Sequence, residues 1–224
     1  MSKNHKPKTV LVVAAHPDDE VLGCGATIAR HHRNGDQIHI LILAEGISNR
    51  HAPGRLHQAA HQSAKILGAS SLFLQQFPDN RMDSLDLLDI VKVVEEHMDH
   101  HRPDVVYTHH GGDLNIDHQL THQAVITACR PQPGHCVKTM LFFEVPSSTE
   151  WQPSKSVAAF TPDWFVDVSS TWPIKIKALK AYALEMKPWP HPRSLKSVEH
   201  LARWRGSTAG YAAAEAFILG RHRE

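Results

Sequence analysis

The sequence has 224 residues, of which 42% are hydrophobic, and this predicts one domain with a sizeable core over residues 1–224. Its 24 lysines and arginines balance 23 aspartates and glutamates, which excludes the basic surface of a protein that binds nucleic acid or an anionic membrane. The first apolar run, residues 9–15, is far shorter than a membrane span, and no secretory signal is recognisable. Three cysteines form no paired framework, so a cytoplasmic protein is expected.

Strands and helices alternate in the first half of the chain. The continuous, valine-rich segment 9–15 is typical of a strand buried on both faces. A helical pattern follows at 20–34, where Asp18 or Asp19 is placed to cap the first turn and Gly35 to close the last. Further strands are expected at 37–44, 71–75 and 103–108, and further helices at 55–67, 84–101 and 118–129. This alternation indicates a parallel sheet with right-handed crossovers.

The second half is less regular. Strands are expected at 139–145 and 165–168, helices at 171–186 and 195–205, and either a strand or a helix at 210–219. Residues 187–194 contain three prolines and predict an extended loop. The expected fold is therefore a single-domain, Rossmann-like α/β three-layer sandwich, with a mostly parallel sheet and a less regular C-terminal part.

A cluster of ionisable side chains stands where the first strand gives way to the first helix. The segment His16-Pro17-Asp18-Asp19-Glu20 lies at the end of an α/β sheet at which ligands bind. His16 and Asp19 are three residues apart, so they project to the same side if the chain turns helical at once, and both are good zinc ligands. Asp18 then points elsewhere, and a carboxylate beside a metal can accept a proton from a bound water.

Two other interpretations of this segment were weighed. An acidic helix start is often only a cap that complements the helix dipole. A dinucleotide-binding turn does not fit, because carboxylates occupy the positions where glycines should approach the pyrophosphate.

A second polar loop follows the strand at 103–108 and offers a third metal ligand from the same edge of the sheet. It contains His109, His110 and His118, any of which could complete the site, and Asp117-His118 opens a helix as the first motif does. Three protein ligands leave a coordination position open, which a hydrolytic zinc site needs and a structural site lacks.

The sequence Ala-His-Pro-Asp-Asp-Glu at 15–20, with Asp117-His118 about a hundred residues later, resembles the PIG-L/LmbE family of zinc-dependent N-deacetylases. The resemblance extends over most of the chain. It implies zinc ligands at His16, Asp19 and His118, with Asp18 as the general base that activates the attacking water. It also implies that the substrate is an N-acetylated amino sugar of the N-acetylglucosamine type.

One position departs from the family pattern. Many members have a histidine that stabilises the oxyanion where this chain has Asn115. An asparagine amide can donate a hydrogen bond to an oxyanion but cannot act as an acid near neutrality. Either Asn115 takes the electrostatic part alone, or His109, His110 or His191 replaces the imidazole. Asp117 either orients such a histidine or caps the helix.

Substrate-binding side chains are expected in loops at the same sheet edge. Arginines suit phosphates, carboxylates and sugar hydroxyls, and carboxylates suit sugar hydroxyls. The candidates are Arg50, Arg55, Asp79, Arg81, His191 and Arg193, with Asp79 and Arg193 preferred.

The leading interpretation is a metal-dependent deacetylase that removes an acetyl group from an N-acetylated amino sugar or its conjugate. Zinc is the expected cofactor, with iron(II) as the alternative metal, and the partner is a small molecule. A homo-oligomer is compatible with the sequence. Two other functions are considered: a zinc amidase on a non-sugar N-acyl compound, and a sugar- or metal-binding relative that has lost catalysis.

Overall fold

The computed structural model describes residues 6–44, 54–153 and 157–224. It contains a seven-stranded sheet with the strand order β3-β2-β1-β4-β5-β7-β6. The five strands β1 to β5 are parallel, whereas β7 runs antiparallel to both β5 and β6. The strands are β1 (Thr9–Ala14), β2 (Gln37–Ala44), β3 (Ser71–Phe77), β4 (Val105–His109), β5 (Thr139–Phe143), β6 (Trp164–Asp167) and β7 (Ala214–His222).

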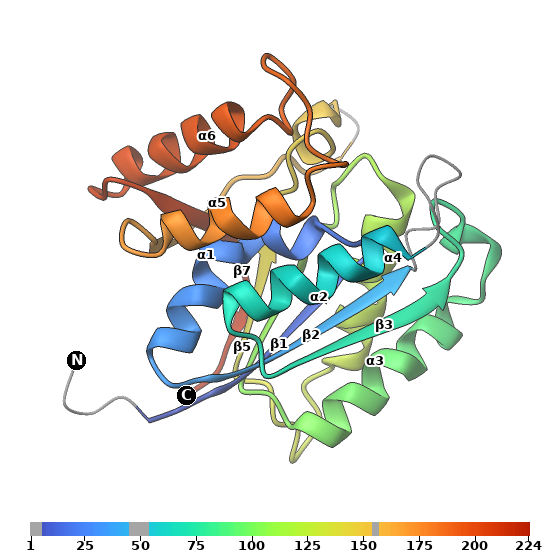
Figure 1. The fold of residues 1–224 in the computed structure, drawn as a ribbon. Helices are drawn as coiled ribbons and strands as arrows, with labels where there is room; N and C mark the ends of the chain where they lie inside the picture. The colour runs from blue at the N-terminus through green and yellow to red at the C-terminus, as the bar shows by residue number, and fades with distance from the viewer. Residues whose placement is uncertain (1–5, 45–53, 154–156) are drawn as a thin grey trace.

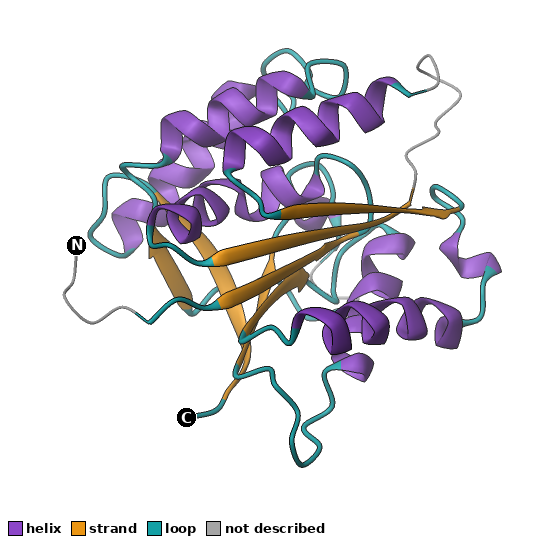
Figure 2. Ribbon diagram, turned by 60° about the horizontal axis from the view of Figure 1, so that its bottom comes forward, coloured by secondary structure: helices purple, strands orange, loops and turns teal. Residues whose placement is uncertain are grey.

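Helices cover both faces of the sheet, so the molecule has three layers (Figures 1 and 2). The helices are α1 (Asp19–Arg33), α2 (Arg55–Leu67), α3 (Leu87–His101), α4 (Ile116–Ala128), α5 (Trp172–Ala181) and α6 (Leu195–Thr208). Residues of α1, α2 and α5 share one apolar core with alternate residues of β1, while α3 and α4 form a second core on the other face. In the described part of the chain, no helix is both long and apolar enough to cross a membrane.

The strand β1 lies at the centre of the sheet between β2 and β4. Its residues from Val10 to Ala14 are fully buried, because side chains on both faces meet helices. The loop after β1 is therefore anchored on its strand side by the most deeply buried part of the sheet, and it leads directly into α1.

The expected α/β fold with a mostly parallel sheet is confirmed. The strand at 37–44 and the helix at 55–67 have the predicted bounds, and Gly68 closes the latter helix with φ 80°. The segment whose type was left open, 210–219, contributes to strand β7. Two helices are shorter than expected: α3 begins at Leu87 after a 3₁₀ turn at Met82–Ser84, and α5 ends at Ala181.

Candidate metal and active site

Two polar segments meet at the carboxyl edge of the parallel strands. The turn that holds His16 follows β1, and the loop before α4 follows the neighbouring strand β4. Parallel neighbours end at the same edge, so residues about a hundred positions apart in sequence come together there.

His16, Asp19 and His118 present three ligand atoms to one point. The Nδ1 atom of His16 lies 3.2 Å from the Oδ2 atom of Asp19 and 3.3 Å from the Nε2 atom of His118. The distance from the same Asp19 oxygen to His118 Nε2 is also 3.2 Å. These separations are those of donor atoms that share one cation, and zinc accepts two imidazoles and a carboxylate.

Each imidazole has a carboxylate behind it. Asp117 Oδ2 lies 3.0 Å from His16 Nε2, and Asp113 Oδ1 lies 3.1 Å from His118 Nδ1. A hydrogen bond to the far ring nitrogen fixes the tautomer and leaves the near nitrogen free for a metal. Asp117 makes this hydrogen bond to His16, and Asp113 lies within ion-pair distance of His118 Nδ1, while His16 Nδ1 and His118 Nε2 both lie near Asp19.

The charges around the imidazoles favour a cation. Burial lowers the pKa of His16, but hydrogen bonds to Asp117 and Asp19 outweigh this and raise it to about 10. For His118, burial is likewise outweighed by Asp19 and Asp113, which raise the pKa to about 9. The Oδ1 atom of Asp19 is buried and accepts no hydrogen bond from the described residues. The residues therefore fit a divalent metal ion, whose charge would compensate the negative charge of the surrounding carboxylates.

Asp18 is not one of the grouped ligands, and its carboxylate pairs with a residue from the C-terminal part of the chain. Its backbone has φ 104°, a left-handed conformation that aspartate tolerates better than most residues. Arg193 Nη1 donates to Asp18 Oδ2 at 2.8 Å, and the same side chain donates through Nε to Ser147. Burial raises the pKa of Asp18 to about 7, although Arg193 opposes the shift. The carboxyl is thus held in place with a proton affinity suited to base chemistry near neutrality.

Glu20 stabilises the turn in place of the expected cap. Neither Asp18 nor Asp19 caps α1 with its side chain; instead Glu20 Oε2 accepts the Asp18 N–H at 3.0 Å. Tyr182 in turn donates its hydroxyl hydrogen to Glu20 Oε1 at 2.8 Å. The capping interpretation of Asp18 and Asp19 was therefore wrong, because the left-handed turn redirects the Asp18 side chain to Arg193.

A cavity of about 350 Å³ opens beside His16 and Asp18. Its walls carry carboxylates, cations and one large aromatic ring. The lining residues are His16, Pro17, Asp18, Leu56, Asp79, Asn80, Asn115, Ser147, Trp151, Glu185, Lys187, His191 and Arg193.

The sequence-predicted substrate residues divide into two groups. Asp79, His191 and Arg193 line the cavity, whereas Arg55 and Arg81 do not. Arg55 is the first residue of α2 and is exposed, whereas the next residue, Leu56, lines the cavity. Arg50 lies outside the described residues.

Of the three histidines considered as substitutes at the Asn115 position, only His191 lines the cavity. His109 is buried, stacks on His118 with ring centroids 4.0 Å apart, and accepts the Ala15 N–H. The His110 ring contacts the Ala158 carbonyl instead.

Asn115 serves as the N-cap of α4. Its Oδ1 atom accepts the Asp117 N–H at 2.8 Å, and its amide donates to Asn80 at 3.1 Å. Asp117, which was expected either to orient a histidine or to cap this helix, lies against His16 and leaves the cap to Asn115.

Several residues of the site were not singled out in the sequence. Asp113 accepts hydrogen bonds from Ser148 and Thr149, with the Thr149 bond 2.6 Å long, and holds His118. Trp151 meets the His191 ring at a centroid distance of 5.7 Å. The only sequence signal for Asp113 was an acidic residue in the same loop as His118.

The comparisons with known proteins agree with this geometry. The model of the family described as PIG-L, GlcNAc-PI de-N-acetylase, matches residues 11–129. The chain is 32% identical over 188 residues to the uncharacterized deacetylase YaiS of Escherichia coli strain K12, covering 81% of this chain and 94% of that one. The chain belongs to the PIG-L family.

Two more distant relatives have names that specify different reactions. A 1D-myo-inositol 2-acetamido-2-deoxy-alpha-D-glucopyranoside deacetylase of Saccharopolyspora erythraea is 25% identical over 82% of this chain and 79% of its own length. A 4-oxalmesaconate hydratase of Pseudomonas putida is 28% identical over 84% of this chain and 78% of its own.

The fold of this PIG-L family member also matches solved structures. A conserved protein of Thermus thermophilus superimposes with a TM-score of 0.80 at 25% identity, covering 97% of this chain and 96% of that one.

Proposed function

We propose that this protein is a cytoplasmic, zinc-dependent N-deacetylase that acts on an N-acetylated amino sugar or its conjugate. The observation that carries the proposal is the convergence of His16, Asp19 and His118 beside a cavity into which Asp18 also faces. Three ligands with a separate carboxyl base form the minimum set for metal-assisted amide hydrolysis. The three free cysteines support a reducing compartment.

The chain's own residues supply the proton chemistry. A divalent ion held by His16, Asp19 and His118 would polarise the acetamide carbonyl and acidify water. Asp18 accepts a proton from the attacking water, whose oxygen forms the new bond to the acyl carbon. As the C–N bond breaks, the same proton passes to the amine nitrogen, and acetate and a free amine leave. Arg193 keeps the buried carboxyl oriented between the two transfers.

We assign the missing imidazole of the oxyanion site to His191. Its Nδ1 atom accepts a hydrogen bond from the backbone N–H of Arg193 at 3.1 Å. The Nε2 atom therefore carries the ring proton of the neutral imidazole. The amide of Asn115 is already engaged with Asn80 and Asp117. His191 is therefore the better-placed donor for an oxyanion in this cavity.

The cavity's volume and lining support a sugar-sized substrate. At about 350 Å³ it is of the size that binds small molecules. Asp79 and Glu185 can accept hydrogen bonds from hydroxyl groups, and the Trp151 ring offers an apolar wall. The deacetylase from Saccharopolyspora erythraea, whose name specifies an acetamido sugar, supports the same class.

The test is an acetate-release screen with protein of measured zinc content. The panel holds N-acetylhexosamines, their nucleotide conjugates, N-acetylated amino acids and 4-oxalmesaconate. The proposal expects acetate from one or more sugars, in proportion to bound zinc. Acetate only from amino acids would make the protein an amidase, and water addition to 4-oxalmesaconate would make it a hydratase like its Pseudomonas relative.

A further inference from the structure

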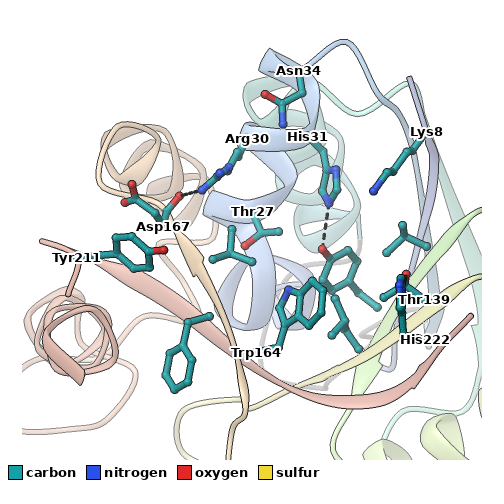
Figure 3. Close-up of a pocket in the computed structure, with 15 residues that line it drawn as sticks. Lys8, Thr27, Arg30, His31, Asn34, Thr139, Trp164, Asp167, Tyr211 and His222 are labelled. Atoms are coloured by element: carbon teal, nitrogen blue, oxygen red, sulfur yellow. Dashed lines mark hydrogen bonds between the residues drawn. The ribbon is translucent and has the colours of Figure 1, made fainter. Parts of the chain in front are cut away.

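A second cavity lies at the opposite, amino edge of the sheet. It has a volume of about 310 Å³ and is enclosed by the C-terminal half of α1, the strands β4 and β5, and the strand β6 (Figure 3). Thr139 and Val105 begin β5 and β4, so the cavity is separated from the site at the carboxyl edge by the length of the sheet. None of the residues that line it belongs to the candidate metal site.

The floor and one wall of this cavity are apolar. Val105, Leu141 and Val166 contribute aliphatic surface, and Trp164 contributes a ring that is 37% exposed. A second aromatic residue, Tyr211, stands on the same side and is 42% exposed. Aromatic walls of this kind pack well against a flat ring.

Thr27 on α1 lies in the wall of the cavity. Its side chain is 1% exposed, and its Oγ1 atom is buried beneath the cavity surface and makes no hydrogen bond with any described residue. In Figure 3, His31 lies between Arg30 and Lys8, while Thr27 and Trp164 lie below them.

A hydrogen-bonded chain fixes the polar side of the cavity. The His31 Nδ1 atom lies 2.6 Å from Asp36 Oδ2, so it carries the ring proton. His31 Nε2 then accepts the hydroxyl hydrogen of Tyr107 at 2.9 Å (Figure 3). The two side chains are thereby held rigidly at the cavity wall, as expected for a preformed pocket.

Two cations, Lys8 and Arg30, border the cavity together with one carboxylate, that of Asp167. Lys8 and Arg30 form no ion pair with a carboxylate in residues 6–44, 54–153 or 157–224. Arg30 donates instead to the backbone carbonyl of Asp167, whose carboxylate is occupied by Ser169. A guanidinium with free N–H groups beside an aromatic wall is suited to a carboxylate on a flat ligand.

We propose that this cavity is a second binding site, which takes a small aromatic carboxylate. The ring packs between Trp164 and the aliphatic floor, and the carboxylate meets Arg30 and Lys8. This inference does not depend on the reaction at the other edge of the sheet.

The test is calorimetric titration of the full chain with three probes: indole-3-acetate, its neutral analogue indole-3-acetamide, and acetate. Indole-3-acetate is expected to bind at one site per chain, at least about tenfold more tightly than either other probe, because only it offers both ring and charge. Arg30→Ala is expected to weaken its binding at least about tenfold. Arg33→Ala is the matched control, since Arg33 also lies on α1 and also donates to a backbone carbonyl but does not line the cavity.

Two further variants locate the binding. Thr27→Trp is designed to fill the cavity and abolish binding. Trp164→Ala, at a partly exposed position, is expected to weaken binding, and it replaces Thr27→Trp in the test if the latter variant does not fold. His118→Ala removes a ligand of the candidate metal site and is expected to leave the affinity unchanged. The proposal is overturned if indole-3-acetate does not bind, if Arg30→Ala and Arg33→Ala bind it equally, or if His118→Ala alone abolishes binding.

Discussion

At the residue scale, the separate duties of Asp18 and Asp19 follow from one backbone angle. The left-handed conformation of Asp18, with φ 104°, turns its side chain toward Arg193 while Asp19 remains in line with His16. Two adjacent and chemically identical residues thus face different partners. The spacing of His16 and Asp19 is local and was readable in the sequence, whereas the contact of Asp18 with Arg193 spans 175 positions and was not.

Asp18→Asn tests the assignment of the general base. Loss of the proton-accepting carboxylate is expected to lower the turnover number for acetate release by about 10²- to 10⁴-fold. Bound zinc, measured by atomic absorption, is expected to stay stoichiometric, because Asp18 is not among the grouped ligands. Asp83→Asn, at an exposed aspartate that does not line the cavity, is the control and keeps full activity. A turnover number within a factor of two of the wild type in Asp18→Asn would contradict the role.

Asp117→Asn tests the carboxylate behind His16. The amide has the size of the carboxylate but no negative charge, and its single oxygen cannot accept the hydrogen bonds that the two Asp117 oxygens accept from Asn80 and Met82. Zinc affinity, measured by competition with a chelator, is expected to fall about 10- to 100-fold. Asp113→Asn is the matched change behind His118 and is expected to act in the same direction. Unchanged zinc affinity in both variants would contradict the proposed role of Asp117 and Asp113 in orienting the two histidines.

At the scale of elements, α1 connects the two edges of the sheet and is not a regular helix. It breaks at Cys24, where φ is −142°. The backbone N–H groups of Ala26 and Thr27, which follow the break, donate to Glu215 at 3.0 and 2.7 Å. Lys175 pairs with the same carboxylate at 2.6 Å. A side chain from β7 therefore restarts the helix, a long-range contact that periodicity along α1 could not reveal.

The sequence predicted the elements of the first half better than those of the second, for a physical reason. Buried parallel strands such as β1 are continuous apolar runs bounded by helices, so their pattern is local. In the second half, β7 runs antiparallel between β5 and β6, and its type depends on those neighbours. Prediction of the site had the same limit. The motif at 15–20 lies within one short segment, whereas Asp113 accepts hydrogen bonds from Ser148 and Thr149, which are distant in sequence and are brought close only by folding.

Gly23→Ala tests how closely α1 packs on the sheet. Alanine favours an exposed helix by about 1 kcal/mol over glycine, so propensity alone predicts stabilisation. Here a Cβ atom would lie 2.3 Å from the ring of Phe143, which is fully buried. We expect the free energy of unfolding in urea to fall by about 1–3 kcal/mol. In a double-mutant cycle, Phe143→Leu, which makes room, is expected to reduce the cost of Gly23→Ala; a stabilised Gly23→Ala would refute the packing argument.

At the scale of the whole molecule, two small groups among the 19 histidines respond to protons in opposite directions. Those of the candidate metal site lie among carboxylates, which raise the pKa values of His16 and His118. A second group lies where the C-terminal end of α3 covers β2: the rings of His39 and His101 stack 3.8 Å apart, with His97 next to His101. Burial and mutual repulsion lower the pKa values of these three, that of His101 to about 4.

The histidines at the end of α3 are expected to make the fold sensitive to acid. Because the folded pKa of His101 is about 4 and that of an unfolded chain about 6.5, the unfolded state binds more protons between these values. Stability is therefore retained above about pH 6.5 and falls as the pH drops toward 4.

Urea midpoints at pH 7.5 and pH 5 measure the effect. His101→Phe keeps a ring against His39 and Phe73 but cannot titrate, so it is expected to narrow the difference between the two midpoints. His200→Gln, on an exposed face of α6, is the control and is expected to keep the wild-type difference between the two urea midpoints. If His101→Phe also keeps the wild-type difference, the acid sensitivity belongs to other groups.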